Sequence, residues 1–363
     1  MEYKLHQVLE QFNINTEMSS YGNGYINDTY ITKPYILQRI NSNVFKNPED
    51  LMENISAITE HLRKKILLSG GNPDRETLTI IKTKDGEKYY KTNENDYFRV
   101  YKFIDNAVTY DEVQDPMQFY YGAKAFGKFQ NMLSDFPVDK LYETIPNFHN
   151  TATRFEDLLK AIEDNKCGRL EEVGKEIEFI KKRRRDVSII VDAMKDGSIP
   201  LRVTHNDTKL NNVMIDIKTG EGVCVIDLDT VMPGSLLYDY GDALRYGASS
   251  GREDETDLSK IWFDMNLFKY FTKGYFHEVL PILVPKEIEL MAFSVKLMTF
   301  ECGIRFLTDY LNGDTYFKIH KEKHNLHRAR TQFKLVSDIE GKMDIMNKII
   351  RELIEGNQNG SIF

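Results

Sequence analysis

Cysteine is scarce in this sequence, and long apolar runs do not occur. The three cysteines, Cys167, Cys224 and Cys302, are too few and too scattered for a disulfide framework or a metal knuckle. No segment approaches the ~18 consecutive apolar residues that span a bilayer, and the start, MEYKLHQVLEQFNI, is amphipathic without the apolar core of a signal peptide. We therefore expect a reduced, cytoplasmic protein that is not inserted in a membrane.

An excess of positive charge is also missing. The 48 lysine and arginine residues are outnumbered by 56 aspartate and glutamate residues, which gives a formal net charge of −8. This balance does not favour nucleic acid or a membrane surface as a partner. The basic run from Lys181 to Arg185 is best explained as the end of a solvated helix face. The expected partner is a small molecule, and the oligomeric state stays open.

A small sheet that carries one helix is expected in the first part of the chain. In SSYGNGYINDTYITKPYILQRI a glycine pair separates two β-type stretches, and a third strand follows at Tyr35–Ile40. A helix-start signal at positions 47–50 precedes apolar residues at helical spacing from Leu51 to Ile66. The alternating segment from Glu76 to Asp105 predicts the remaining strands.

Beyond residue 105 the pattern becomes mostly helical. Phe119, Ala123, Phe126, Phe129 and Leu133 lie at the spacing of one apolar helix face. One β-type island, VMIDIKTGEGVCVIDLD, interrupts the helices with two apolar runs around a glycine-containing turn. The sequence therefore predicts an α+β protein whose character changes near residue 105.

The stretch HNDTKLNN, just before this island, has the residue types that phosphoryl transfer requires. That reaction needs a group to orient and deprotonate the acceptor hydroxyl, and hard oxygen ligands for Mg²⁺. Asp207 and Asn212 have the spacing of the aspartate and asparagine in the kinase pattern H-R-D-x-x-x-x-N. We expect Asp207 to be the catalytic base and Asn212 to be a metal ligand.

A second aspartate, Asp227, ends the apolar strand of the island, where a kinase has the carboxylate that joins the metal to the phosphates. Strand alternation would place Asp229 on the same face. Either fragment alone also fits a polar loop with an Asx turn, or a strand end in water. The strand, turn and strand between the two fragments favour the catalytic interpretation, so ATP and Mg²⁺ are the expected cofactors.

Three segments, HNDTKLNNVMID, CVIDLDTVMPGSLLYDYGDALR and ECGIRFLTDYLNGDTYFK, resemble the bacterial N-acetylhexosamine 1-kinases, a branch of the aminoglycoside phosphotransferase and choline kinase superfamily. The resemblance runs through nearly the whole chain. It implies a protein-kinase-like bilobal α+β fold, with a small nucleotide-binding lobe over residues 1–104 and a larger, mainly helical catalytic and substrate-binding lobe over residues 105–363. It also implies phosphorylation of the anomeric hydroxyl of N-acetylglucosamine or N-acetylgalactosamine.

The same resemblance assigns residues to the nucleotide. YGNGYINDTYI is similar to the family's phosphate loop, so Gly22 and Gly24 are expected beside the phosphates, and Tyr25 stands where we would expect histidine. The hinge between the lobes is expected around Val100 to Phe103. Lys209 matches the lysine that follows the base in many protein kinases, and we expect it to contact the γ-phosphate.

The phosphate-binding lysine of the third kinase strand has no lysine counterpart here. Gln38 and Arg39 occupy that stretch, and adjacent strand residues face opposite ways, so the register decides between them. We assign Arg39 to the role, with Glu53 or Glu60 of the following helix as the residue that holds it and Glu53 as the choice. Asp239 and Asp242 in YDYGDALR resemble the superfamily's structural aspartate, which supports the catalytic loop.

For the acceptor, Asp229, Arg305 and Tyr316 match positions that contact the sugar in N-acetylhexosamine kinases, beside Asp207 itself. Carboxylate and guanidinium groups can hydrogen-bond sugar hydroxyls and an acetamido oxygen, and tyrosine adds an apolar face with a polar tip. Arg305 has an equal alternative, because Glu301 stands four residues earlier on an expected helix and could hold it in a surface ion pair.

Two other functions compete with this interpretation. The first is a kinase of an aminoglycoside, choline or homoserine, but the basic residues between Arg305 and Arg330 argue against a polycationic acceptor. The second is a non-catalytic nucleotide- or sugar-binding pseudokinase. The presence of Asp207, Asn212 and Asp227 together disfavours it.

Overall fold

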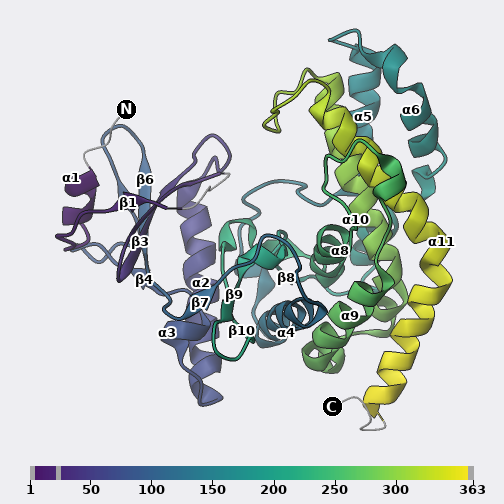
Figure 1. Ribbon diagram of the computed structural model, residues 1–363. Helices are drawn as coiled ribbons and strands as arrows, with labels where there is room; N and C mark the ends of the chain where they lie inside the picture. Colours follow the sequence, from purple (N-terminus) through teal and green to yellow (C-terminus); the bar gives the residue numbers. More distant parts are fainter. Residues whose placement is uncertain (1–4, 22–25, 359–363) are drawn as a thin grey trace.

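The computed structural model describes residues 5–21 and 26–358 (Figure 1). An antiparallel six-stranded sheet forms the N-terminal part, with the order β1-β2-β3-β6-β4 and with β5 paired to β6. Its strands are β1 (Ser19–Ser20), β2 (Asp28–Thr32), β3 (Tyr35–Ile40), β4 (Ile80–Ile81), β5 (Tyr90–Lys91) and β6 (Tyr97–Lys102). The third strand has the bounds expected from the sequence. β4 and β5 are shorter than expected, because each pairs with only part of β6.

Helices cover both faces of this sheet, α1 (Leu5–Glu10) on one side and α2 (Pro48–Leu68) on the other (Figure 1). One apolar cluster joins α1 to the strands through Val8, Leu9, Leu37, Phe98 and Val100. The main core joins α2 to the opposite face through Leu51, Ile55, Ile40, Tyr97 and Tyr101. α2 starts as predicted, since the Asn47 side chain caps it by accepting a hydrogen bond from the Asp50 N–H. Alternate residues of β3 and β6 therefore point to different helices.

The C-terminal part is mainly helical. Its longer helices are α4 (Pro116–Met132), α5 (Thr151–Asp164), α6 (Gly174–Lys181), α7 (Ile189–Lys195), α8 (Leu236–Gly247), α9 (Met265–Val279), α10 (Pro285–Leu311) and α11 (His324–Gln358). α4 packs on α9, and α10 packs against α5, α8 and α11. In the described part of the chain, every helix is too short or too polar to span a bilayer.

Two small sheets lie where the helical part meets the N-terminal part. β7 (Ala107–Val108), β9 (Val213–Asp216) and β10 (Gly222–Val225) form one, and β8 (Arg202–Thr204) with β11 (Met232–Gly234) forms the other. The island expected from the sequence is the β9–β10 hairpin. The predicted fold class, a small antiparallel sheet with a larger helical part, is confirmed.

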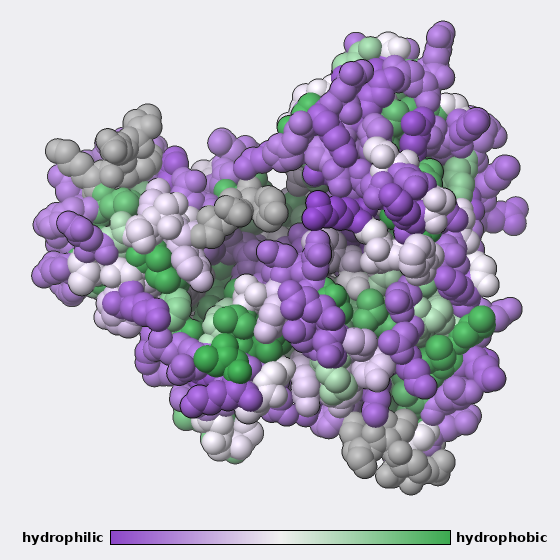
Figure 2. Space-filling model, viewed as in Figure 1, coloured by the Kyte–Doolittle hydropathy of each residue, from purple (hydrophilic) through white to green (hydrophobic). Residues whose placement is uncertain are grey.

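The chain crosses from one part to the other between β6 and β7. Arg75 of α3 (Pro73–Glu76) braces this crossing by binding the carbonyls of Asp105 and Asn106 and the carboxylate of Asp216. The surface is hollowed between the two parts, and hydrophilic residues border much of the hollow (Figure 2). The assignment of residues 1–104 and 105–363 to separate functional lobes stays a prediction.

Candidate active site

The expected catalytic loop, residues 205–212, follows β8 and is anchored by Asp239 of α8. The Asp239 carboxylate accepts hydrogen bonds from the backbone N–H groups of His205 at 2.9 Å and Asn206 at 2.8 Å, and from the Gln130 amide at 2.6 Å. Asp239 is only 2% exposed, and this burial raises its pKa. The N–H groups would be unpaired without it, so Asp239 supports the loop as the sequence predicted.

Asp207, Lys209 and Asn212 lie together in this loop. The Lys209 ammonium lies 2.9 Å from Oδ1 of Asp207, and the Asn212 amide nitrogen donates to Oδ2 at 3.0 Å and to the Asp207 carbonyl at 2.8 Å. Burial opposes the charge on Lys209, yet Asp207 raises its pKa overall. Lys209 therefore stays protonated beside a carboxylate that is still 28% exposed. This is the arrangement expected of a base and a phosphate-neutralising cation.

The orientation of Asn212 follows from its partners. Both of its hydrogen bonds to Asp207 end on oxygen acceptors, so the amide nitrogen must face them. Its amide oxygen is then the atom that can face a cation. Asn212 lies in the 3-10 turn Leu210–Asn212, directly before β9.

Asp227 follows β10 in a left-handed conformation, with φ of 57°. Partial desolvation raises its pKa to about 7, and the charges of Asp229 and Asp207 add to the rise. The side chain is nevertheless open to solvent, so water moderates this effect. A carboxylate that is crowded by two others is a group that a divalent cation would stabilise.

The described residues fit a magnesium ion only in combination with a nucleotide. Within residues 5–21 and 26–358, no group of three or more His, Cys, Asp or Glu side chains is arranged to hold a metal. Magnesium in phosphate-transferring proteins is commonly bound through one or two protein oxygen ligands, with phosphate and water oxygens in the remaining positions. Asp227 and Asn212 supply that kind of set.

Asp229 does not have the position that strand alternation predicts. β10 ends at Val225, and the left-handed residue Asp227 directly precedes the 3-10 turn Leu228–Thr230, so Asp229 points elsewhere. One oxygen of Asp229 lies 2.6 Å from a terminal nitrogen of Arg99, and the other accepts a hydrogen bond from Asn27 at 2.6 Å. Asp229 is 3% exposed. The expectation that it contacts a sugar does not fit this geometry.

Arg39 and Glu53 do not pair, so that prediction is wrong. Arg39 forms ion pairs with Asp28 and Asp96, and Glu53 pairs with Lys88 at 2.8 Å. The reason is the strand register, which turns Arg39 to the face of Leu37 and α1, away from α2. Gln38, the other candidate for this role on β3, faces the opposite side of the sheet.

Gln38 holds the arginine that lies on the α2 side of the sheet. Its side-chain oxygen accepts two hydrogen bonds from Arg99 of β6, at 3.0 and 2.9 Å, across the paired positions of the two strands. Arg99 is 1% exposed. The sequence contains a signal that could have identified it, since an isolated charge within the buried strand YFRVYK needs a partner.

The expected hinge region around Val100 to Phe103 includes the end of β6 and the start of the crossing to the C-terminal part. Val100 lies inside β6, paired on both sides, and its side chain packs with the α1 cluster. Phe103 follows β6, but its N–H already donates to the Pro34 carbonyl at 2.7 Å. The predicted roles of Val100 and Phe103 at the hinge and in nucleotide binding stay predictions. The predictions for Gly22, Gly24 and Tyr25 concern residues outside those that the structure describes.

Arg305 and Tyr316, predicted to bind the acceptor, do line one pocket. It has a volume of about 290 Å³ and is formed by α5, α10 and the segment after α10, with Arg154, Asp157 and Asp309 also in its wall. Asp309 organises that segment by accepting the backbone N–H groups of Thr315, Tyr316 and Phe317. No separate pattern in the sequence indicated Arg154 or Asp309.

The alternative for Arg305, an ion pair with Glu301 at the surface, is wrong. Glu301 is 1% exposed, accepts a hydrogen bond from Thr151 at 2.6 Å and lies 2.8 Å from Nδ1 of His149. The Arg305 guanidinium instead lies over the ring of Phe148, 5.4 Å from its centroid. Nε2 of His149 lies 3.2 Å from the Asn206 carbonyl, so this buried group connects α10 to the catalytic loop.

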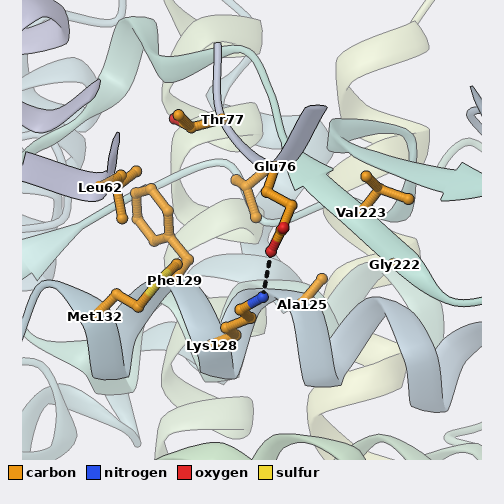
Figure 3. A pocket seen from close by; sticks show the side chains of 10 residues that line it. Leu62, Glu76, Thr77, Ala125, Lys128, Phe129, Met132, Gly222 and Val223 are labelled. Carbon is orange, nitrogen blue, oxygen red and sulfur yellow. Dashed lines mark hydrogen bonds and ion pairs between the residues drawn. The ribbon is translucent and has the colours of Figure 1, made fainter. Parts of the chain in front are cut away.

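A second crevice, drawn in Figure 3, is not a substrate site. It lies between α2, α4 and β10, is crossed by the ion pair of Glu76 with Lys128, and contains none of the catalytic residues. Its volume of about 20 Å³ leaves room for little more than one water molecule.

Residues 17–267, more than half of the chain, match the model of a family described as the phosphotransferase enzyme family, APH. Solved structures support the same fold. The GDP complex of aminoglycoside 2'-phosphotransferase-IIIa superimposes with a TM-score of 0.58 at 15% identity, covering 92% of this chain and 99% of that one.

Two further structures are similar. A microcompartment-associated aminopropanol kinase gives a TM-score of 0.56 at 15% identity, covering 94% of this chain and 98% of that one. A choline/ethanolamine kinase family protein from Mesorhizobium loti gives 0.55 at 14% identity, with 93% of each chain covered. At these identities the structures show the fold, and the acceptors named for them belong to those proteins.

Proposed function

This chain belongs to the phosphotransferase enzyme family, and from that premise we propose that it transfers the γ-phosphate of ATP, with Mg²⁺, to the anomeric hydroxyl of N-acetylglucosamine or N-acetylgalactosamine. The family supports a phosphotransferase that acts on a hydroxyl group of a small molecule. The nucleotide, the metal and the sugar are our proposal. The observation that carries it is the combination of the Asp207 cluster with an acceptor pocket that presents Arg305 and Tyr316.

In the proposed reaction, the Asp207 carboxylate accepts the proton of the anomeric hydroxyl while that oxygen attacks the γ-phosphorus. The bond from the γ-phosphorus to the bridging oxygen breaks, and ADP leaves. Lys209 sits at Asp207 with its charge retained, so it can neutralise the transferred phosphoryl group. Asn212 and Asp227 would hold Mg²⁺, which neutralises phosphate charge when it is bound.

The charge of the acceptor pocket supports a neutral sugar over an amine. Arg154 and Arg305 both face it, and burial together with the charge of Arg305 lowers the pKa of Arg154. Two carboxylates also line the pocket. Asp309 already accepts hydrogen bonds from backbone N–H groups, and the Asp157 carboxylate lies 3.6 Å from a terminal nitrogen of Arg154. A cationic acceptor would meet two guanidinium groups here. An acetamido oxygen or ring hydroxyl could accept hydrogen bonds from them.

A panel of acceptors tests this proposal. ADP release should be measured with ATP and Mg²⁺ and with N-acetylglucosamine, N-acetylgalactosamine, glucose, choline, homoserine, aminopropanol or kanamycin, and the Asp207→Asn variant serves as the blank. Both acetylated sugars should be turned over, with glucose much poorer, because a site that pairs its polar groups with an acetamide leaves them unpaired otherwise. Efficient turnover of an amine-bearing acceptor, with no response to the sugars, would refute the acceptor assignment.

A further inference from the structure

The arginine at the junction of the two parts comes from an unexpected strand. Kinases use a lysine on the third strand, held by a helix glutamate, to link the sheet to the nucleotide phosphates. Here the third strand offers Gln38, and its paired neighbour on β6 is Arg99. The arginine and the amide are joined by two hydrogen bonds, at 3.0 and 2.9 Å. Gln38 thereby fixes the plane of the guanidinium.

The Arg99 guanidinium also contacts a residue outside the sheet. A terminal nitrogen of Arg99 lies 2.6 Å from Oδ1 of Asp229, two residues after the proposed metal ligand Asp227. Burial opposes the charge on Arg99, but Asp229 raises its pKa overall, so the arginine stays charged. The ion pair is almost completely buried, with the Arg99 and Asp229 side chains 1% and 5% exposed.

The second oxygen of Asp229 binds a residue next to another strand of the sheet. It accepts a hydrogen bond from Asn27 at 2.6 Å, and the side-chain oxygen of Asn27 accepts one from the Asn41 N–H at 3.0 Å. Asn27 lies directly before β2. One carboxylate of the C-terminal part is therefore bound by a residue of β6 and by the residue directly before β2, two different strands of the N-terminal sheet.

We propose that Arg99 is a positioning residue for the metal-binding turn, taking the linking role of the missing third-strand lysine through Gln38 and Asp229. The Arg99–Asp229 pair holds residues 227–230 against the sheet, and this fixes the direction of the Asp227 carboxylate. The inference rests on the donor half of the proposed function, the binding of ATP with Mg²⁺. It does not depend on which acceptor is used.

A buried pair that only stabilised the fold would behave differently. Removing one partner leaves a buried charge and lowers stability, whereas replacing both partners by apolar side chains commonly restores it. A positioning role adds a separate effect, because residues that orient a metal ligand usually change metal affinity or activity by roughly 10–100-fold when they are mutated. Stability and magnesium dependence can thus be separated.

The test compares wild type with Arg99→Met, with the double variant Arg99→Met/Asp229→Leu, and with Arg183→Met as a control. Arg183 lies 2.6 Å from Glu340 of α11 in a partly buried pair. For each protein, the melting temperature is recorded first without ligand, and then with ATP at increasing Mg²⁺ and no acceptor. The ligand-induced shift gives the half-saturating Mg²⁺ concentration.

Arg99→Met should raise that concentration by roughly 10–100-fold. The double variant should regain stability without regaining magnesium binding, and Arg183→Met should lose stability with magnesium binding unchanged. Normal magnesium dependence in Arg99→Met, or its recovery in the double variant, would overturn the proposal, as would a wild type without Mg²⁺-dependent ATP binding. A wild type that binds Mg²⁺ and ATP but phosphorylates no hexosamine would refute the acceptor claim alone.

Discussion

The guanidinium of Arg99 lies 2.6 Å from the carboxylate of Asp229 and joins the N-terminal sheet to the turn that carries Asp227. Because both side chains are buried, the two parts of the molecule share a charged contact beside the proposed metal site. Asp239 holds the other side of the site through backbone N–H groups of the catalytic loop. The proposed metal-binding turn and the proposed catalytic loop are thus each held by a buried carboxylate, Asp229 and Asp239 respectively, with different partners.

Replacing Asp207 by asparagine should lower turnover by at least ~10², because the general base is removed while nucleotide contacts are kept. The measurements are kcat with saturating substrates and ATP affinity by calorimetry. Asn211→Ala is the matched control, since this residue of the same loop faces Asp111 and not Asp207. If turnover in Asp207→Asn stayed near that of wild type, Asp207 would not be the base.

Replacing Asp227 by asparagine should raise the melting temperature of the ligand-free protein at pH 8. The pKa of Asp227 is raised to about 7, above its ordinary value, so ionisation opposes folding. The stabilisation given by the protonated group is complete near pH 4 and is lost as pH rises through about 7. The difference in melting temperature between Asp227→Asn and wild type should therefore decrease as the pH is lowered from about 7 towards 4.

The same Asp227→Asn variant should lose Mg²⁺-dependent binding of ATP, because it removes a proposed metal ligand together with its charge. Melting curves from pH 4 to 8, with and without Mg²⁺ and ATP, measure both effects. A variant that was less stable than wild type at pH 8, or that bound ATP with unchanged magnesium dependence, would contradict the role of Asp227.

Features that depend on local sequence signals could be predicted, whereas a contact between residues distant in sequence could not. β3 and the start of α2 were predictable, because alternation over Tyr35–Ile40 and the Asn47 cap are local signals. The Asp207–Asn212 contact was predictable from a short spacing within one loop. The partner of Arg99 was not, because Asp229 is distant in sequence and the left-handed Asp227 redirects the chain between strand and turn.

Replacing Asp239 by alanine should destabilise the protein by about 2 kcal/mol or more, because buried donors of His205, Asn206 and Gln130 lose their acceptor. Turnover should fall with it. Urea unfolding measures the free-energy change, and Asp192→Ala, at an exposed aspartate of α7, is the control. Equal stability of the two variants would mean that Asp239 does not anchor the loop.

Arg305→Ala and Glu301→Ala should affect different properties, sugar kinetics in the first and stability in the second. Arg305→Ala should lower kcat/KM for the acetylated sugars about tenfold or more through a lost hydrogen bond to a buried polar group, with ATP affinity and melting temperature unchanged. Glu301→Ala should lower the melting temperature, because His149 and Thr151 lose their buried partner. A stability loss in Arg305→Ala with normal sugar kinetics would remove Arg305 from the acceptor site.

The position of the transferred phosphate is the most direct test of the proposed reaction. The product formed from N-acetylglucosamine, ATP and Mg²⁺ should be examined by ³¹P NMR with coupling to the sugar protons. We predict a phosphorus signal coupled to the proton of the anomeric carbon, for N-acetylglucosamine and N-acetylgalactosamine alike. A phosphate on any other sugar oxygen, or no sugar phosphate while choline, aminopropanol or kanamycin is phosphorylated, would contradict the account.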